Sequence, residues 1–385
     1  MDLFGDPLPP EKPEKEESAV LNLQEDPESL PDWDTPQGGS DHPRNTFHCL
    51  GYEKAEGFLL GLSKKHEIPH GLIFSGPKGV GKCTFAYRLA RFLLKNGALA
   101  SGMESLSIAP DDRVSRLVAS GAHPDLLLVA RMMDDKKGRA KEAVLVDDVR
   151  KVAPFLRKTA SQDGGWRVVI VDDADTMNRN AQNALLKILE EPPAQTLIIL
   201  IAHRIGAFVP TIRSRCRILH CSAPDKPLFH KILTEKGLAL SFEEEALLYR
   251  LSGGSVGRAL DLHTRDVYGI LEDTLDILAL YPNPAWANIH LFSEKITRQD
   301  PEDPYQVFAE LLPWIFQEQV KARARGVAFD PVFADRSGFN AVLLESSLET
   351  LVKICDTLQV HFDTVAHANL DKRQAVLGAF ALIAA

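Results

Sequence analysis

The chain has 385 residues, of which 45% are hydrophobic and 25% charged, a composition typical of a globular protein with two or three domains. No apolar stretch approaches the ~20 residues that a membrane helix needs, and the acidic N-terminus lacks the pattern of a signal peptide, so we expect a cytoplasmic protein without a membrane partner. The net charge of −9 comes almost wholly from residues 1–44, which hold twelve acidic and three basic side chains, so contact with nucleic acid would need a local basic patch.

Residues 1–45 are expected to form a disordered, acidic tail. The first 44 residues contain eight of the 24 prolines in the chain and few large apolar side chains. Such a segment cannot bury enough apolar surface to offset the conformational entropy lost on folding. We therefore expect the ordered part of the chain to begin near Thr46.

From residue 46 to 222 strands are predicted to alternate with helices, which indicates an α/β domain with a mostly parallel sheet and helices on both faces. Short apolar runs predict strands at 72–74, 126–129, 143–146, 168–171 and 196–201. The helical spacing of apolar side chains predicts helices at 82–95, 147–160 and 178–190. Pro154 should kink or break the second helix, and Asn178 is a suitable N-cap for the third.

After residue 222 the chain has no convincing strand pattern, and amphipathic patterns predict helices instead. These helices run over about 225–236, 242–251, 256–266, 269–280, 305–324, 341–360 and 364–382. We place domain boundaries near residues 222 and 267. A small helical domain would then occupy 223–267, and a larger all-α domain would occupy 268–385.

A glycine-rich segment, Gly76-Pro77-Lys78-Gly79-Val80-Gly81-Lys82, follows the first predicted strand and opens the first predicted helix. These are the spacing and context of a phosphate-binding P-loop, in which glycines let backbone N–H groups turn toward the phosphates. Gly76, Gly79 and Gly81 are thus candidate nucleotide-binding residues, and Lys82 would neutralise the terminal phosphates. A simple glycine turn between a strand and a helix is the alternative interpretation.

The positions that should bind magnesium and orient water depart from the P-loop pattern. Cys83 stands where Ser or Thr would ligate Mg²⁺, a hard cation that prefers oxygen, and Thr84 lies about 100° farther around the helix. Asp172 ends the strand at 168–171 and is the natural carboxylate for Mg²⁺. Asp173 follows where hydrolytic members of this class usually carry Glu, and a misplacement on the order of 1 Å can cost ~10²-fold in rate. We therefore expect weak binding of ATP and Mg²⁺ with little or no hydrolysis, although Asp173 could also be a strand-end carboxylate without a role.

Two arginines follow the strand at 196–201, in the segment Thr211-Ile212-Arg213-Ser214-Arg215-Cys216. An arginine held rigidly at a domain edge can stabilise charge on the γ-phosphate of a neighbouring subunit, a role worth ~10³–10⁵ in rate. From the residues alone, a surface arginine in a salt bridge is the simpler interpretation.

Three blocks of sequence are specific when they are taken together: Asp172-Asp173-Ala174-Asp175, Asn183-Ala184-Leu185-Leu186-Lys187-Ile188-Leu189-Glu190-Glu191-Pro192-Pro193, and Ser214-Arg215-Cys216. With the P-loop they resemble the clamp-loader branch of the AAA+ proteins. His123-Pro124-Asp125 and Val146-Asp147-Asp148-Val149-Arg150 are similar to the same family. The resemblance covers roughly residues 46–266.

The resemblance implies a fold and roles for individual residues. The fold would be an α/β P-loop AAA+ domain at 46–222, a helical lid domain at 223–267 and a helical, oligomerising collar domain at 268–385. Arg215 would complete the ATP site of the neighbouring motor subunit in trans. Arg258 would be the second sensor arginine, unless it is a surface charge on a lid helix, and His203 lies near the first sensor position.

The resemblance also implies partners and cofactors. The partners would be the tau/gamma and delta clamp-loader subunits, the sliding clamp and primed DNA, within a pentameric hetero-oligomer. Many relatives carry a four-cysteine zinc module after the P-loop helix, but residues 96–125 contain no cysteine, so we expect no zinc. Arg150, Lys151, Arg157 and Lys158 are DNA-binding candidates on one helix, and a solvated helix face is an equal alternative.

Two other classes of protein remain open. A self-sufficient AAA+ ATPase motor would use the same P-loop, but Cys83 and Asp173 argue against efficient hydrolysis. A P-loop kinase of a small molecule would leave both Ser214-Arg215-Cys216 and the helical C-terminal third unexplained.

Overall fold

A computed structural model provides the structure of the chain. It describes residues 42–97, 103–134, 139–140, 143–161, 165–281, 283–298, 303–327, 346–368 and 370–384. The chain divides into two units, residues 1–37 and 38–385, and all described residues belong to the second. The predicted disordered tail lies outside the described residues, apart from residues 42–45.

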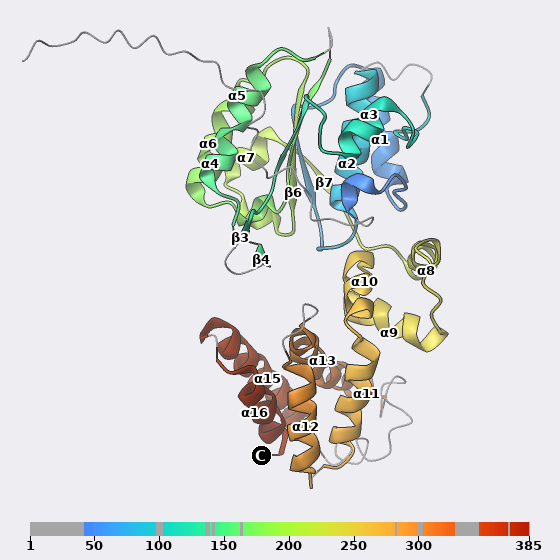
Figure 1. The fold of residues 1–385 in the computed structure, drawn as a ribbon, viewed down its shortest axis with the longest axis vertical. Coiled ribbons are helices and arrows are strands. Elements are labelled where there is room, and N and C mark those ends of the chain that lie inside the picture. The colour runs from blue at the N-terminus through green and yellow to red at the C-terminus, as the bar shows by residue number, and fades with distance from the viewer. Residues whose placement is uncertain are drawn as a thin grey trace, which may run out of the picture. The chain divides into compact units, whose positions relative to one another are not determined.

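A five-stranded parallel sheet in the order β2-β5-β6-β1-β7 forms the centre of the N-terminal domain (Figure 1). Its strands are β1 (Gly71–Ser75), β2 (Leu126–Val129), β5 (Arg167–Val171), β6 (Thr196–Ala202) and β7 (Arg217–His220). Every residue of β1, β5 and β6 is buried, as expected for parallel strands that are covered on both faces. The predicted strands at 168–171 and 196–201 are neighbours, which confirms the expected pairing. A separate short hairpin joins β3 (Met133–Asp134) and β4 (Arg139–Ala140).

Helices cover both faces of this sheet, with α1 to α3 on one face and α4 to α7 on the other (Figure 1). They are α1 (Glu53–Lys64), α2 (Lys82–Asn96), α3 (Arg113–Ala119), α4 (Val146–Arg150), α5 (Val152–Arg157), α6 (Arg179–Glu190) and α7 (Pro210–Arg215). The described residues also form short 3-10 helices, namely η2 (Pro43–Asn45), η3 (Ala174–Thr176) and η4 (Ile205–Ala207). The α6 helix begins as predicted, because the side chain of Asn178 accepts a hydrogen bond from the Ala181 amide at 2.9 Å.

The described chain beyond β7 is helical. Its helices are α8 (Lys226–Glu235), α9 (Phe242–Ser252), α10 (Val256–Thr264), α11 (Val267–Leu278), α12 (Trp286–Ile296), α13 (Pro304–Ala324), α15 (Leu348–Ala368) and α16 (Lys372–Ala384). Buried apolar side chains from these helices form one continuous core, separate from the core that packs against the sheet. The predicted fold class, an α/β P-loop domain with a parallel sheet followed by helical domains, is confirmed.

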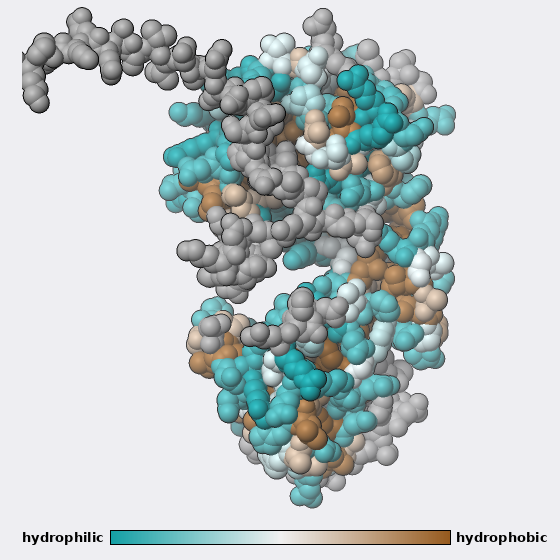
Figure 2. Space-filling view, in the orientation of Figure 1, coloured by the Kyte–Doolittle hydropathy of each residue, from teal (hydrophilic) through white to brown (hydrophobic). Residues whose placement is uncertain are grey.

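The surface is mixed in character. On the face shown in Figure 2, hydrophilic side chains cover most of the described surface, and hydrophobic side chains form smaller patches. No helix within the described ranges is long and apolar enough to cross a membrane.

The strand predicted at 143–146 is wrong. Residues 143–145 form a loop, and Val146 is already the first residue of α4. The buried Val144 donates its amide hydrogen to the Thr176 hydroxyl at 3.1 Å instead of pairing with a strand. A short apolar run does not distinguish a strand from a buried loop, and Asp147 and Asp148 favour the first turn of a helix through its dipole.

The helix predicted at 147–160 is two helices, α4 and α5, which meet at Lys151. Pro154 lies within the first turn of α5, where its missing amide costs nothing. Its ring would clash with the carbonyl group four residues earlier, which belongs to Arg150, and α4 ends at that residue.

The last predicted helices are displaced. The turn expected between 360 and 364 lies between 368 and 372, because α15 continues to Ala368. Residues 341–345 of the preceding prediction lie outside the described residues. The short or weakly patterned helices α1, α3 and α12 were not predicted from the sequence.

Candidate nucleotide-binding site

The P-loop connects β1 to α2, and close packing explains its glycines. Gly79 and Gly81 have φ angles of +79° and +94°, which other residues rarely adopt. A Cβ atom on Gly76 would lie only 1.9 Å from the carbonyl oxygen of Cys221. The sequence therefore forms the tight strand-to-helix turn that a phosphate-binding loop requires.

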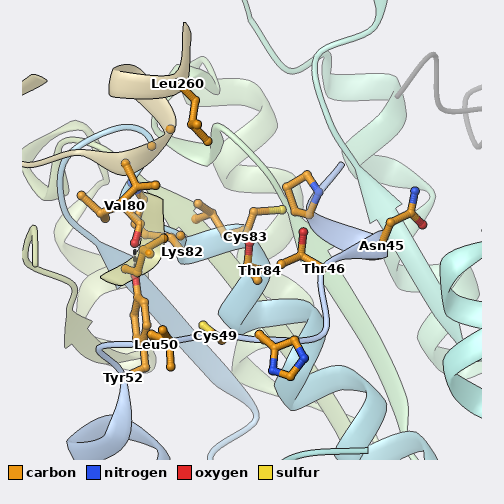
Figure 3. Close-up of a pocket in the computed structure, with 18 of the residues that line it drawn as sticks. Asn45, Thr46, Cys49, Leu50, Tyr52, Val80, Lys82, Cys83, Thr84 and Leu260 are labelled. Carbon is orange, nitrogen blue, oxygen red and sulfur yellow. Dashed lines mark hydrogen bonds between the residues drawn. The ribbon is translucent and has the colours of Figure 1, made fainter. Parts of the chain in front are cut away.

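A cavity of about 660 Å³ opens beside this loop, a volume in the range of ligand-binding pockets. Most of its lining comes from six parts of the chain that lie close together only in the fold: residues 43–52, residues 78–84, the ends of β5 and β6, and helices α8 and α10. Figure 3 shows side chains of the first two parts, and Leu260 of α10, around this cavity. Tyr52 supports the wall, since its ring stacks on Phe85 and its hydroxyl donates to the Val80 carbonyl at 3.0 Å.

Residues that follow the carboxyl ends of the central strands line one part of the cavity. The order β5-β6-β1 brings together Asp172 and Asp173 after β5, His203 after β6, and Lys82 after β1. Lys82 is almost fully buried, at 3% exposure, and its ammonium group donates to the carbonyl oxygens of Gly76 and Pro77 at 2.7 and 2.6 Å. Burial lowers the pKa of Lys82, although Cys221 and the nearby carboxylates oppose this shift.

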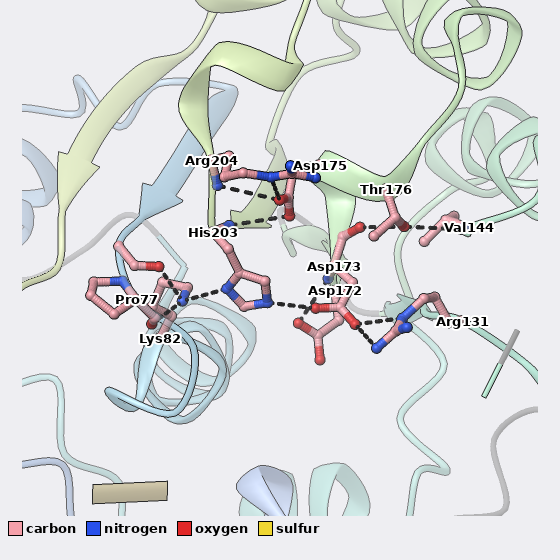
Figure 4. A network of polar contacts seen from close by, with 11 residues as sticks. Pro77, Lys82, Arg131, Val144, Asp172, Asp173, Asp175, Thr176, His203 and Arg204 are labelled. Atoms are coloured by element: carbon pink, nitrogen blue, oxygen red, sulfur yellow. Dashed lines mark hydrogen bonds and ion pairs between the residues drawn. The ribbon is translucent and has the colours of Figure 1, made fainter. Parts of the chain in front are cut away.

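Asp173 is held by two side chains rather than exposed. Its carboxylate lies 2.8 Å from Nε2 of His203 and forms an ion pair with Arg131 at 2.6 Å (Figure 4). Burial alone would raise the pKa of this carboxyl group, but His203 and Arg131 lower it to about 2. Asp173 is therefore ionised and already has partners.

Asp172 and Cys83 occupy the positions expected to bind magnesium. Burial, with the charge of Asp173, raises the pKa of Asp172. Burial also raises the pKa of the Cys83 thiol far above its usual value, as do the charge of Asp172 and a hydrogen bond to it. A protonated thiol is a poor ligand for a hard cation. Thr84 lines the cavity as well, one residue farther along α2.

The helix α10 contacts the P-loop through its first residues. The Ser255 hydroxyl donates to the Lys78 carbonyl at 2.6 Å, and the Gly257 amide donates to the Gly79 carbonyl at 2.8 Å. These bonds use carbonyl groups of the P-loop and none of its amide groups.

Arg258 follows immediately, but its side chain does not line this cavity. Its guanidinium forms an ion pair with Glu310 of α13 at 2.7 Å, and both side chains are nearly half exposed. The Arg258 side chain is thus paired with Glu310, while the Arg258 backbone lies beside Gly79 of the P-loop.

Arg215 is the last residue of α7 and also lies outside the cavity. Its guanidinium forms an ion pair with Glu190 at 2.9 Å and donates to the Thr211 carbonyl at 3.2 Å. The side chain is about one-third exposed, so it is both oriented and accessible.

The four DNA-binding candidates do not share one continuous helix, because α4 ends at Arg150 and α5 ends at Arg157. Arg150 and Lys151 form ion pairs with Asp147 and Asp148 of their own segment. Arg157 and Lys158 are exposed. The predicted stripe along a single helix is therefore wrong in its geometry, and a DNA contact stays a prediction.

Sequence reasoning missed Arg131 and the wall formed by residues 43–52. Arg131 follows β2, so the rule that strand ends of a parallel sheet share one edge could have indicated it. Nothing in the sequence pattern singles out residues 43–52. Within the described residues, no group of three or more His, Cys, Asp and Glu side chains is placed to hold a metal ion.

Comparison with known proteins agrees with this architecture. Residues 53–225 match the family model described as DNA polymerase III, delta subunit. The P-loop domain is therefore similar to that family. The resemblance to clamp-loader AAA+ proteins is thereby confirmed for the P-loop domain.

Individual relatives of this part of the chain support the same resemblance. DNA polymerase III subunit delta' of Pseudomonas aeruginosa is 37% identical over 209 residues, covering 54% of this chain and 59% of the relative. Subunit delta' of Escherichia coli is 34% identical over 221 residues, covering 57% and 62%. Subunit tau of Salmonella typhimurium is 31% identical over 212 residues, covering 54% and 30%. The chain thus matches about three-fifths of the delta' proteins' length.

Proposed function

We propose that the chain is a delta'-type subunit of a DNA polymerase III clamp loader. In this function it joins the tau/gamma and delta subunits in a pentameric hetero-oligomer and helps to load the sliding clamp on primed DNA during replication in the cytoplasm. It donates Arg215 to the ATP site of a neighbouring subunit and has weak or no ATPase activity of its own.

The placement of Arg215 carries this proposal. Arg215 is absent from the described residues that line the chain's own cavity, so it has no evident role at that site. Glu190 and the Thr211 carbonyl orient its guanidinium, yet the side chain remains about one-third exposed. An oriented and accessible cation at a domain edge suits the charge that develops on a neighbour's γ-phosphate.

The chain's own cavity supports nucleotide binding more than hydrolysis. The P-loop and the cavity volume fit ATP, whereas a thiol at Cys83 in place of a hydroxyl disfavours Mg²⁺. Asp173 would have to leave two partners before it could orient a water molecule. We therefore propose that ATP binds weakly, that Mg²⁺ contributes little, and that Arg258 reaches nucleotide only if it leaves Glu310.

Arginine substitutions in a reconstituted loader test this function. Arg215→Ala should lower the DNA- and clamp-stimulated ATPase rate by ~10³-fold or more at its partner site, while the complex still assembles. Arg213→Ala is the matched control, because Arg213 is exposed on the same short helix. Unchanged turnover with Arg215→Ala would refute the role of Arg215.

A self-sufficient AAA+ motor is the second candidate, and the intact P-loop beside a cavity of about 660 Å³ favours it. A steady-state ATPase assay on the isolated chain separates the two functions. Turnover that Lys82→Ala abolishes would favour the motor, and an inactive chain would favour the non-motor subunit.

A further inference from the structure

Acceptor groups of the protein already take up the hydrogen-bond donors of the Lys82 ammonium group. A lysine ammonium has three N–H donors. Three acceptors surround this one, namely the carbonyl oxygens of Gly76 and Pro77 at 2.7 and 2.6 Å and Nδ1 of His203 at 3.0 Å (Figure 4). The lysine that should meet the terminal phosphates therefore has no donor left over for them.

The geometry defines the tautomer of His203. An ammonium group can only donate, so Nδ1 of His203 must accept, and the ring proton must lie on Nε2. That nitrogen lies 2.8 Å from the Asp173 carboxylate, which can accept the proton's hydrogen bond. The His203 ring thus bridges Lys82 and Asp173.

Two further contacts hold His203 in this position. Asp173 is itself fixed by Arg131 at 2.6 Å, so the acceptor for Nε2 cannot move freely. The backbone amide of His203 donates to the carboxylate of Asp175 at 3.1 Å, and Asp175 is buried. Both the ring and the backbone of His203 are therefore anchored.

The three acceptors of Lys82 are not equally easy to replace. Gly76 and Pro77 belong to the P-loop itself, and moving their carbonyl groups would distort the loop. His203 contributes only a side chain, which rotation about two bonds can withdraw from the lysine. A phosphate oxygen that enters the site would therefore take the place of Nδ1 of His203.

We infer that His203 competes with the terminal phosphate of a nucleotide for Lys82 and so weakens the binding of nucleoside di- and triphosphates. This inference rests on the nucleotide site of the proposed function. It differs from a sensor role, in which the side chain would itself bind the phosphate. The two roles predict opposite effects when His203 is removed.

Calorimetric titration of the full chain with ATP tests the inference. His203→Ala should raise the affinity for ATP by about tenfold or more, the factor expected when a hydrogen bond to a charged group no longer has to be displaced. The affinity for AMP should not change, because AMP lacks the terminal phosphates that meet Lys82. His290→Ala, at an exposed position on α12, is the control and should bind ATP as the unaltered chain does.

Two further variants keep the result interpretable. His203→Asn shortens the side chain and keeps it polar, so it should also raise ATP affinity and can replace the alanine variant if that variant does not fold. Adding Lys82→Ala to His203→Ala should abolish the gain.

Each outcome decides between the possibilities. Equal or weaker ATP binding by both His203 variants, with measurable binding by the unaltered chain, would overturn the competition and leave the nucleotide site in place. No ATP binding by any variant would refute the nucleotide site together with the competition. The role of Arg215 in a neighbour's site depends on neither result, because the reconstituted ATPase assay measures it separately.

Discussion

The contact between α10 and the P-loop can be tested by changing one glycine. The backbone of Gly257 touches that of Gly79, and a Cβ atom on Gly257 would lie 2.9 Å from the Gly79 Cα and 3.0 Å from its carbonyl oxygen. These are backbone atoms, so no side-chain rotation can relieve the overlap. The 2.8 Å hydrogen bond from the Gly257 amide to Gly79 would lengthen or break as well.

The expected change in the free energy of unfolding is the balance of opposing effects. In a helix without such a neighbour, Gly→Ala stabilises a protein by ~0.5–1 kcal/mol. Overpacking costs ~1–3 kcal/mol, and the lost hydrogen bond costs ~0.5–1.5 kcal/mol. The sheet domain and the C-terminal helices have separate cores, so α10 can move away from the P-loop without disrupting either core. The loss in the free energy of unfolding therefore cannot exceed the free energy that the contact between α10 and the P-loop contributes. We expect Gly257→Ala to lower the free energy of unfolding by about 1–2 kcal/mol.

Gly61→Ala is the matched control for this substitution. Gly61 lies in α1, and a Cβ atom there would meet nothing within 4 Å. Urea denaturation should therefore give opposite signs for the two alanine variants. If Gly257→Ala stabilises the chain as Gly61→Ala does, the contact between α10 and the P-loop does not persist in solution.

Three further substitutions probe other parts of the sheet domain. Asp125→Ala breaks an ion pair with Arg167 in which both side chains are less than 10% exposed, so chemical denaturation should show a free energy of unfolding lower by ~3–5 kcal/mol. Asp147→Ala is the control, because it removes an exposed ion pair with Arg150 and should change the free energy of unfolding by less than ~1 kcal/mol. Because the pKa of Asp173 is lowered from 3.8 to about 2, its stabilising contribution is complete above pH 4 and is lost as the pH falls toward 2. Asp173→Asn should therefore flatten the pH dependence of stability in that window, and an unchanged slope would contradict the assigned ion pairs. Cys83→Thr supplies a hydroxyl ligand and should make ATP affinity rise with Mg²⁺, which calorimetry with and without EDTA would detect; magnesium-independent affinity would show that Cys83 does not determine the metal response.

The sequence predicted the strands of the sheet well but not the loops around them. The apolar runs at 168–171 and 196–201 are strands because a parallel strand buried on both faces is apolar throughout. The run at 126–129 is also a strand, although it lies at the edge of the sheet and alternates between buried and partly buried residues. The run at 143–146 is apolar as well, yet it forms a loop and the first residue of α4 and is not a member of the described sheet. Strand pairing is decided by the whole fold, and a local pattern does not contain it.

In the candidate site, too, some residues could be predicted from the sequence and others could not. The P-loop and Asp172 could be identified because each lies at the end of a strand in a motif of fixed spacing. The pairing of Asp173 with Arg131 and His203 could not be read from local spacing, because both partners are far from Asp173 in sequence and are brought close by the order of the strands. Spacing motifs predict which residue types are present, whereas charge pairing depends on the side chains that the fold places around them.

The β6 strand leads both to the cavity and to Arg215. The cavity can therefore be poorly suited to hydrolysis while Arg215 remains well oriented. The β6 strand is buried along its whole length, so its carboxyl end is rigidly placed. His203 follows that end directly and faces Lys82, whereas Arg215 lies farther along the chain at the end of α7, outside the cavity. A change at Cys83 alters the metal position on α2 and leaves the support of Arg215 intact. A chain with a poor hydrolytic site can therefore still present a well-oriented arginine to a neighbour.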